Sequence, residues 1–60
     1  MDIKTQREKA GITQAELAAR LNVTQAAIAI WETGEAMPRS DKLPEISKIL
    51  GCSIDELFGE

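Results

Sequence analysis

The chain has 60 residues, a net charge of −3, one cysteine and no histidine. A chain this short forms one domain, residues 1–60, and buries only about 60% of the surface that its unfolded form would expose, which limits its stability. A single thiol excludes an internal disulfide, and without histidine or a second thiol we expect no metal site and a cytoplasmic location. No apolar run approaches the roughly 20 residues of a membrane span, and the polar start MDIKTQREKA is unlike a secretory signal, so no membrane segment is expected.

Two helices are predicted in the first third of the chain. The first covers residues 3–10, and Gly11 ends it. Thr13 and Glu16 form a T-x-x-E capping box, in which each side chain satisfies backbone donors of the first turn. A second helix over residues 14–21 follows from this box. Its apolar stripe consists of Leu17, Ala18 and Leu21.

The third predicted helix follows the second after a short turn. Asn22 tolerates positive φ better than most residues, which suits a sharp turn. Thr24 is a good N-cap for a helix over residues 25–33, which Gly34 ends. Two helices separated by about three residues make a helix-turn-helix, here at about residues 14–33.

A fourth helix is predicted after the loop GEAMPRS, with Ser40 or Asp41 as its N-cap. Pro44 is compatible with this helix only in the first turn, which places the start to within a residue or two. The helix runs to Leu50, and Gly51 ends it.

The end of the chain carries a second capping box, formed by Ser53 and Glu56, which begins a last short helix. We expect its apolar side chains to be buried; they are Ile54, Leu57 and Phe58. Cys52 is interpreted as a small core residue. Since no strand pattern is present, the sequence predicts an all-α fold of five short helices.

The third helix has an unusual outward side. Successive side chains of a helix lie about 100° apart, so Ile28 and Trp31 can face inward together. The side chains that then face outward are Ala26, Ala29, Ile30 and Thr33, with Gln25 in the exposed first turn. A solvated face of small residues is the ordinary interpretation. Three features favour a contact surface instead. They are the exposed isoleucine, the small residues that permit close approach, and the position of the helix in a helix-turn-helix.

Residues 13–33, TQAELAARLNVTQAAIAIWET, resemble the helix-turn-helix of the phage-repressor and Cro-like family of DNA-binding regulators, also called the xenobiotic-response-element type. The resemblance extends through REKAGIT before this segment and through WETG and LPEISKILGCSIDEL after it, so it covers essentially the whole chain. Apolar or small residues stand where the motif requires them, at Leu17, Ala18, Leu21, Val23, Ile28 and Trp31. The resemblance implies the compact five-helix fold of lambda-repressor-like domains and binding to double-stranded DNA.

The resemblance also implies roles for single residues. Gln14 corresponds to a phosphate contact, and Arg39 to an arginine that reaches the DNA backbone or the minor groove. Arg7 and Glu32 correspond to a structural ion pair between the first and third helices. The base-reading helix comprises Thr24, Gln25, Ala26, Ala29 and Ile30, and Thr33 continues its outward side. Lys42 adds charge near the loop; Gln14, Lys42 and Arg20 fit a solvated surface equally well.

The chain departs from this family at the base-reading helix. Members often carry polar or basic groups where this chain has Ala26, Ala29 and Ile30. Gln25 can pair with N6 and N7 of adenine, and Thr24 can reach a phosphate or a base. The other contacts would be apolar, and the C5-methyl of thymine is the apolar feature of the major groove.

Two functional classes follow from these observations. The first is a sequence-specific double-stranded DNA-binding regulator, a repressor that acts as a homodimer on a palindromic operator. The alternative is a protein-interaction module on the same fold, such as the partner-binding domain of an antitoxin, with Ile30 and Met37 as an apolar docking patch. The negative charge and the uncharged helix favour the alternative, whereas Gln14, Gln25 and Arg39 favour DNA binding. Without a nucleophile beside a base or a glycine-rich phosphate loop, we expect no enzymatic activity, cofactor or small-molecule substrate.

Overall fold

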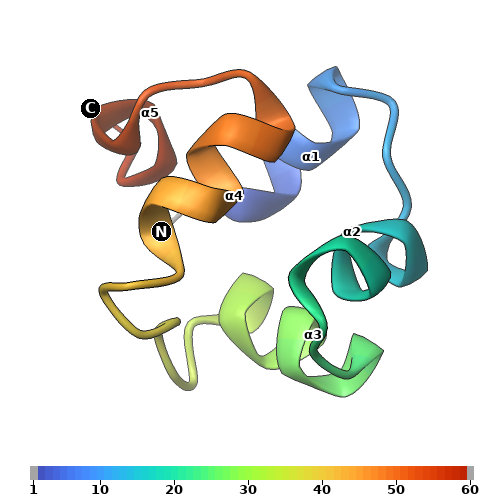
Figure 1. Ribbon diagram of the computed structural model, residues 1–60. Helices are drawn as coiled ribbons and strands as arrows, with labels where there is room; N and C mark the ends of the chain where they lie inside the picture. The colour runs from blue at the N-terminus through green and yellow to red at the C-terminus, as the bar shows by residue number, and fades with distance from the viewer. Residues whose placement is uncertain (1, 60) are drawn as a thin grey trace.

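The computed structural model describes residues 2–59 and places five α-helices in them (Figure 1). The helices are α1 (Ile3–Lys9), α2 (Gln14–Leu21), α3 (Gln25–Thr33), α4 (Leu43–Leu50) and α5 (Ile54–Leu57). No strand occurs in this part of the chain. The all-α fold of five short helices is thus confirmed, while the first and last residues of the predicted domain lie outside the described residues.

The helix starts are fixed by local hydrogen bonds that the sequence predicted. The hydroxyl of Thr13 accepts from the backbone N–H of Glu16 at 3.1 Å, and the Glu16 carboxylate accepts from the backbone N–H of Thr13 at 3.2 Å. The same reciprocal pair begins α5 at Ser53. Thr24 accepts from the backbone N–H of Ala27 at 3.1 Å at the start of α3. Each bond satisfies a backbone donor that has no partner within its helix.

The turn between α2 and α3 depends on Asn22. Its φ of 57° lies in the left-handed region, and its backbone N–H donates to the carbonyls of Ala18 and Ala19. This conformation ends α2 abruptly and lets α3 begin three residues later. The two helices consequently pack directly against each other.

The start of α4 differs from the prediction. Neither Ser40 nor Asp41 caps the helix; Lys42 is the N-cap residue and its side chain makes no capping bond. A turn closed by the backbone N–H of Lys42 on the carbonyl of Arg39, at 2.9 Å, occupies these residues instead. Starting the helix after this turn keeps Pro44 within the first turn, where its missing N–H costs nothing.

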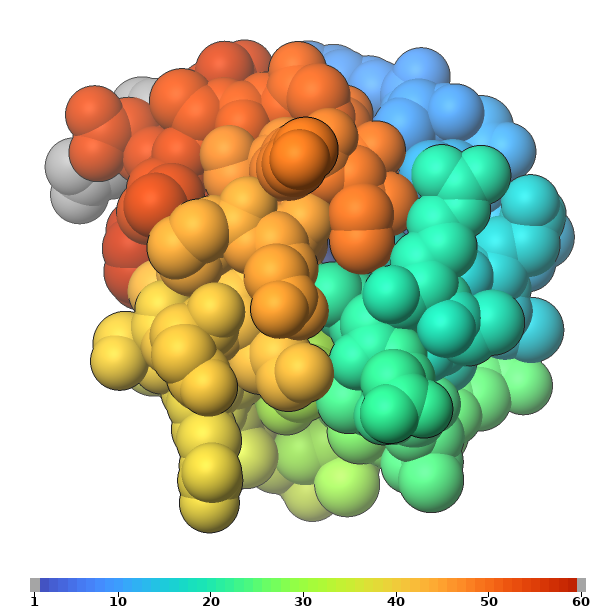
Figure 2. All heavy atoms as spheres, viewed as in Figure 1, coloured from blue at the N-terminus to red at the C-terminus, as the bar shows by residue number. Residues whose placement is uncertain are grey.

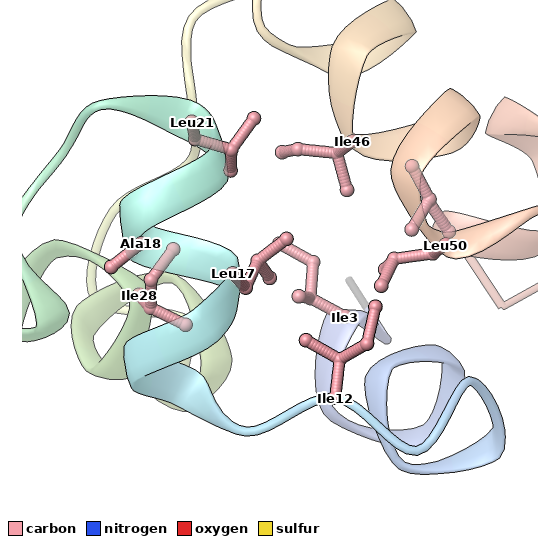
Figure 3. Close-up of a cluster of buried hydrophobic side chains, with 9 residues drawn as sticks. Ile3, Ile12, Leu17, Ala18, Leu21, Ile28, Ile46 and Leu50 are labelled. Carbon is pink, nitrogen blue, oxygen red and sulfur yellow. The ribbon is translucent and has the colours of Figure 1, made fainter.

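The core lies between all five helices. Figure 3 shows Leu17 and Leu21 of α2 directed toward Ile46 and Leu50 of α4, with Ile3 of α1 beside them. The buried hydrophobic side chains are Ile3, Ile12, Leu17, Ala18, Leu21, Ile28, Ile46, Leu50 and Leu57. Val23, Trp31, Ile49 and Cys52 are partly buried against this core. Helix positions that share one face thus supply most of the packing, as the periodicity predicted.

The last helix buries less than expected. Leu57 is fully buried, but Ile54 is 37% exposed and Phe58 is 43% exposed. The expectation that all three would be buried was therefore wrong. A helix of one turn can direct only one side to the core, and Ile54 and Phe58, four residues apart, share the side next to it.

Candidate nucleic-acid interface

The outward side of α3 begins with Gln25 and Ala26, which are exposed, and continues with Ile30, which is 40% exposed. Ile28 is fully buried on the opposite side, which fixes this orientation. Ala29 is only partly exposed, so it lies at the edge of the outward side. In Figure 1, α3 lies at the lower edge of the molecule. The exposed side therefore combines one amide with small or apolar side chains.

Thr33 continues this side at the end of α3 and is exposed. Its hydroxyl donates to the backbone carbonyl of Ile30 at 2.9 Å. This bond uses the hydroxyl proton within the helix, so Thr33 can offer only an acceptor to a partner. Thr24 differs, because its oxygen accepts from the backbone N–H of Ala27 and its hydroxyl proton remains available to a partner.

An ion pair joins α1 to α3. Arg7 Nε donates to Glu32 Oε2 at 2.7 Å, and Arg7 Nη2 donates to Glu32 Oε1 at 3.3 Å. The two side chains are only 11% and 6% exposed. Arg7 Nη1 also donates to the carbonyl of Ile12 at 2.9 Å, which ties the loop after α1 to the same pair. The forked guanidinium is the group best suited to so many simultaneous acceptors.

The environment favours the charged form of both partners. The hydrogen bond to Glu32 and its charge raise the pKa of Arg7 against the effect of burial. Burial acts to raise the pKa of Glu32, but the hydrogen bonds from Arg7 and Gln14 and the charge of Arg7 outweigh it, so this pKa lies below its ordinary value. The pair is ionised at neutral pH.

Glu32 also connects the ion pair to the outward side of α3. Gln14 Nε2 donates to Glu32 Oε1 at 2.9 Å, and Gln25 Nε2 donates to Gln14 Oε1 at 3.4 Å. A continuous series of hydrogen bonds thus runs from Arg7 to Gln25 through three helices. The oxygen of Gln25 and its second amide hydrogen take no part in it. The buried pair therefore helps to orient the exposed amide of Gln25 while leaving its pairing edge free.

The link between the two glutamines was not predicted. The sequence signal that could have suggested it is the repeated Thr-Gln pair at residues 13–14 and 24–25, which places a glutamine first in each of two adjacent helices. Gln14 was expected to contact a phosphate at the start of the second helix. In the structure it is half-buried and has one hydrogen bond to each side, so a phosphate would meet its second amide hydrogen or the adjacent backbone.

The basic residues near the loop differ from one another. Arg39 is exposed, next to the buried Pro38. Lys42 is half-buried, and its Nζ donates to the carbonyl of Leu21 at 3.3 Å and lies 3.6 Å from a carboxylate oxygen of Glu45. An ammonium at the carbonyl end of α2 is stabilising there. Lys42 therefore joins α2 to α4, a structural role that the sequence did not reveal.

A hollow of about 310 Å³ lies between the end of α2 and α4 (Figure 2). Its lining residues are Arg20, Leu21, Asn22, Lys42, Glu45, Lys48 and Ile49. Arg20 thus lines this hollow and is not part of the outward side of α3.

No group of three potential metal-ligating side chains occurs within residues 2–59, and no helix there has the length and apolar character of a membrane span.

The chain matches known proteins over almost its whole length. Residues 3–57 match a helix-turn-helix family model. The chain is 43% identical over 56 residues to the 26 kDa repressor protein of Escherichia phage HK022, covering 87% of this chain and 24% of that protein. It is 43% identical over 47 residues to the transcriptional activator BcrR of Enterococcus faecalis, covering 78% of this chain and 23% of that protein. The chain thus spans about a quarter of the length of these relatives.

A solved structure gives the same result. The fold is similar, with a TM-score of 0.82 and 40% identity, to the P22 c2 repressor in a crystal structure with a synthetic operator. The similarity covers 92% of this chain and 83% of that one. These relatives are named as transcriptional regulators, which agrees with the prediction that the chain has no enzymatic role. The chain belongs to the helix-turn-helix family of DNA-binding transcriptional regulators of the phage-repressor type.

Proposed function

We propose that this chain is the sequence-specific double-stranded DNA-binding domain of a cytoplasmic repressor and that α3 lies in the major groove. The observation that carries the proposal is the exposed amide of Gln25 at the start of α3, oriented through Gln14 by the buried ion pair. The second helix of a helix-turn-helix contacts base edges with its N-terminal residues. The similar P22 c2 repressor has a crystal structure in complex with a synthetic operator, which supports DNA binding by a domain of this fold.

The outward residues divide into positioning and base-reading groups. The first turn of α2, at Gln14, and the exposed Arg39 would contact phosphates, which position the domain without specifying a sequence. The amide of Gln25 would pair with the N6 and N7 edge of an adenine. Ala26 and Ile30 would pack against thymine methyl groups. Thr24, Ala29 and Thr33 would lie in the surrounding contact surface, and Lys42 would add positive charge while it holds α2 to α4.

Two copies would bind a palindromic operator. Helix-turn-helix dimers place their recognition helices about one helical turn of DNA apart, so operator symmetry follows the symmetry of the protein. Ile54 and Phe58 form an exposed apolar pair at α5, and burying this pair against a second copy would remove it from water. A small interface of this kind would give weak association in solution and stronger association on the operator.

The alternative function is a protein-interaction module. It is favoured by the net charge of −3 and by Ile30 and Met37, which are 40% and 59% exposed. In that case the outward side of α3 would bind an apolar surface of another protein. The chain would then bind random-sequence DNA weakly even at low salt.

Selection from random-sequence duplexes, followed by titration of the enriched duplex at two salt concentrations, distinguishes the two functions. DNA binding predicts a palindromic consensus and an affinity that falls with salt by a slope of about −0.9 for each phosphate contacted. A shuffled duplex of equal composition is the matched control. A selection without enrichment, together with binding that does not depend on salt, would contradict the proposal and favour the interaction module.

A further inference from the structure

Beyond its first turn, the outward side of α3 offers almost no hydrogen-bonding group. Ala26 and Ile30 are exposed and Ala29 is partly exposed, and none of them carries a polar atom. The hydroxyl proton of Thr33 is bonded to the carbonyl of Ile30. The side chain of Glu32 is 6% exposed and held in the ion pair. Apart from the oxygen of Thr33, which can still accept, this part of the helix has no group that can bond to a partner's donors or acceptors. It can respond to the shape and the apolar groups of a partner.

This limitation has a consequence for pyrimidines in the major groove. Thymine presents an O4 acceptor and a C5-methyl, whereas cytosine presents an N4 donor and no methyl. A 5-methylcytosine carries the methyl of thymine at the same carbon together with the N4 donor of cytosine. An isoleucine side chain has no donor or acceptor with which to distinguish O4 from N4. It can contact the methyl in either base.

We propose that Ile30 makes DNA binding sensitive to cytosine methylation, by accepting 5-methylcytosine where it accepts thymine. The inference rests on the proposed placement of α3 in the major groove. Burial of one methyl corresponds to a change in affinity of about fourfold. A site with cytosine at the Ile30 position would thus bind more tightly when that cytosine is methylated at C5, and the chain would respond to the methylation state of its site.

Gln25, unlike Ile30, can distinguish bases by hydrogen bonding. Its amide has a free oxygen and a free N–H, so at its position the identity of the purine matters. The Ile30 position must therefore be chosen where Gln25→Ala leaves the base preference unchanged. A scan in which each thymine of the selected operator is replaced by uracil, which lacks only the methyl, identifies such a position.

The test uses four duplexes that differ only at this position: thymine, uracil, cytosine and 5-methylcytosine, each paired with its complement. For the parent chain, thymine should bind about fourfold more tightly than uracil, and 5-methylcytosine about fourfold more tightly than cytosine. Comparing the two cytosines removes the cost of changing the base pair itself. Ile30→Ala should abolish both differences, and Gln25→Ala should retain both. Thermal melts verify that the variants are folded, as expected for two exposed positions.

The outcomes separate this inference from the proposed function. If the parent binds the selected operator but binds the two cytosine duplexes equally, the sensitivity to methylation is refuted while operator binding stands. If Ile30→Ala keeps the fourfold gain, the methyl acts through DNA shape and the role of Ile30 is refuted. If no operator can be selected, both proposals fail together.

Discussion

Replacing Glu32 by alanine should largely unfold the domain. The substitution removes the acceptor of the bonds from Arg7 Nε at 2.7 Å, Arg7 Nη2 at 3.3 Å and Gln14 Nε2 at 2.9 Å. The guanidinium would keep only its bond to the carbonyl of Ile12 and would lose its counter-charge. Since the Arg7 side chain is 11% exposed, water can replace the lost carboxylate only in part.

The size of the effect follows from this burial. Removing one partner of a buried ion pair costs about 3–5 kcal/mol, because the other charge is left uncompensated. Slight exposure of Arg7 places the expected loss near the lower end, about 3 kcal/mol. A chain of this length has a total free energy of unfolding of about 3–9 kcal/mol. The loss would therefore consume a large part of the stability, or all of it.

Thermal melts followed by circular dichroism measure the effect. A loss of about 3 kcal/mol should lower Tm by roughly 12–24 °C in a domain this small. Glu35→Ala is the matched control, because it removes the same charge from an exposed position just beyond α3 and should melt like the parent. In a domain of this size, about 1 kcal/mol corresponds to several degrees in Tm. If Glu32→Ala melts within about 2 °C of the parent, the pair is therefore a surface contact and the reasoning is wrong.

The remaining predictions concern pH, DNA contacts and capping. The folded-state pKa of Glu32 lies below its ordinary value of 4.5, so the contribution of the pair to stability is complete above pH 4.5 and is lost as pH falls through the folded-state pKa. In urea unfolding, the difference in free energy of unfolding between the parent and Glu32→Gln should therefore shrink in acid, and a constant difference would contradict this. Arg39→Ala should weaken binding to all duplexes and reduce the salt slope by about one, and a loss confined to one sequence would rule out a phosphate contact. Thr13→Ala should lower the free energy of unfolding by about 1 kcal/mol and Tm by about 4–8 °C, because it removes the N-cap of α2. An unchanged Tm would show that the bond from the Glu16 backbone to Thr13 does not contribute to stability.

The parts of the fold that depend on local chemistry could be predicted from the sequence. The capping boxes at Thr13 and Ser53 and the left-handed turn at Asn22 involve residues within four positions of one another, so their pattern is visible in the chain. The start of α4 was missed because Ser40 and Asp41 are both good caps, and the turn that ends at Lys42 precludes either. Propensity alone does not distinguish between a cap and a turn.

The sequence predicted which side chains of the site face outward, but not which hydrogen bonds join them to other helices. Placing Ile28 inward fixes where Gln25, Ala26 and Ile30 point, because helix geometry is regular. The bond from Gln25 to Gln14 and that from Lys42 to the end of α2 join residues on different helices. They depend on how the helices pack against each other, which residue spacing within one helix does not determine. The exposure of Ile54 and Phe58 was missed for another reason, because a helix of one turn directs only one side, that of Leu57, to the core.

The central claim is that α3 lies in the major groove with Gln25 on an adenine. Replacing adenines of the selected operator one at a time by 7-deazaadenine tests it most directly, because this base lacks the N7 acceptor and keeps its minor-groove edge. The parent should lose about 1–3 kcal/mol of binding free energy at one adenine in each half-site, and Gln25→Ala should show no loss there. If the parent binds every substituted operator as tightly as the original, or if Gln25→Ala is equally sensitive, α3 does not contact adenine in the way described.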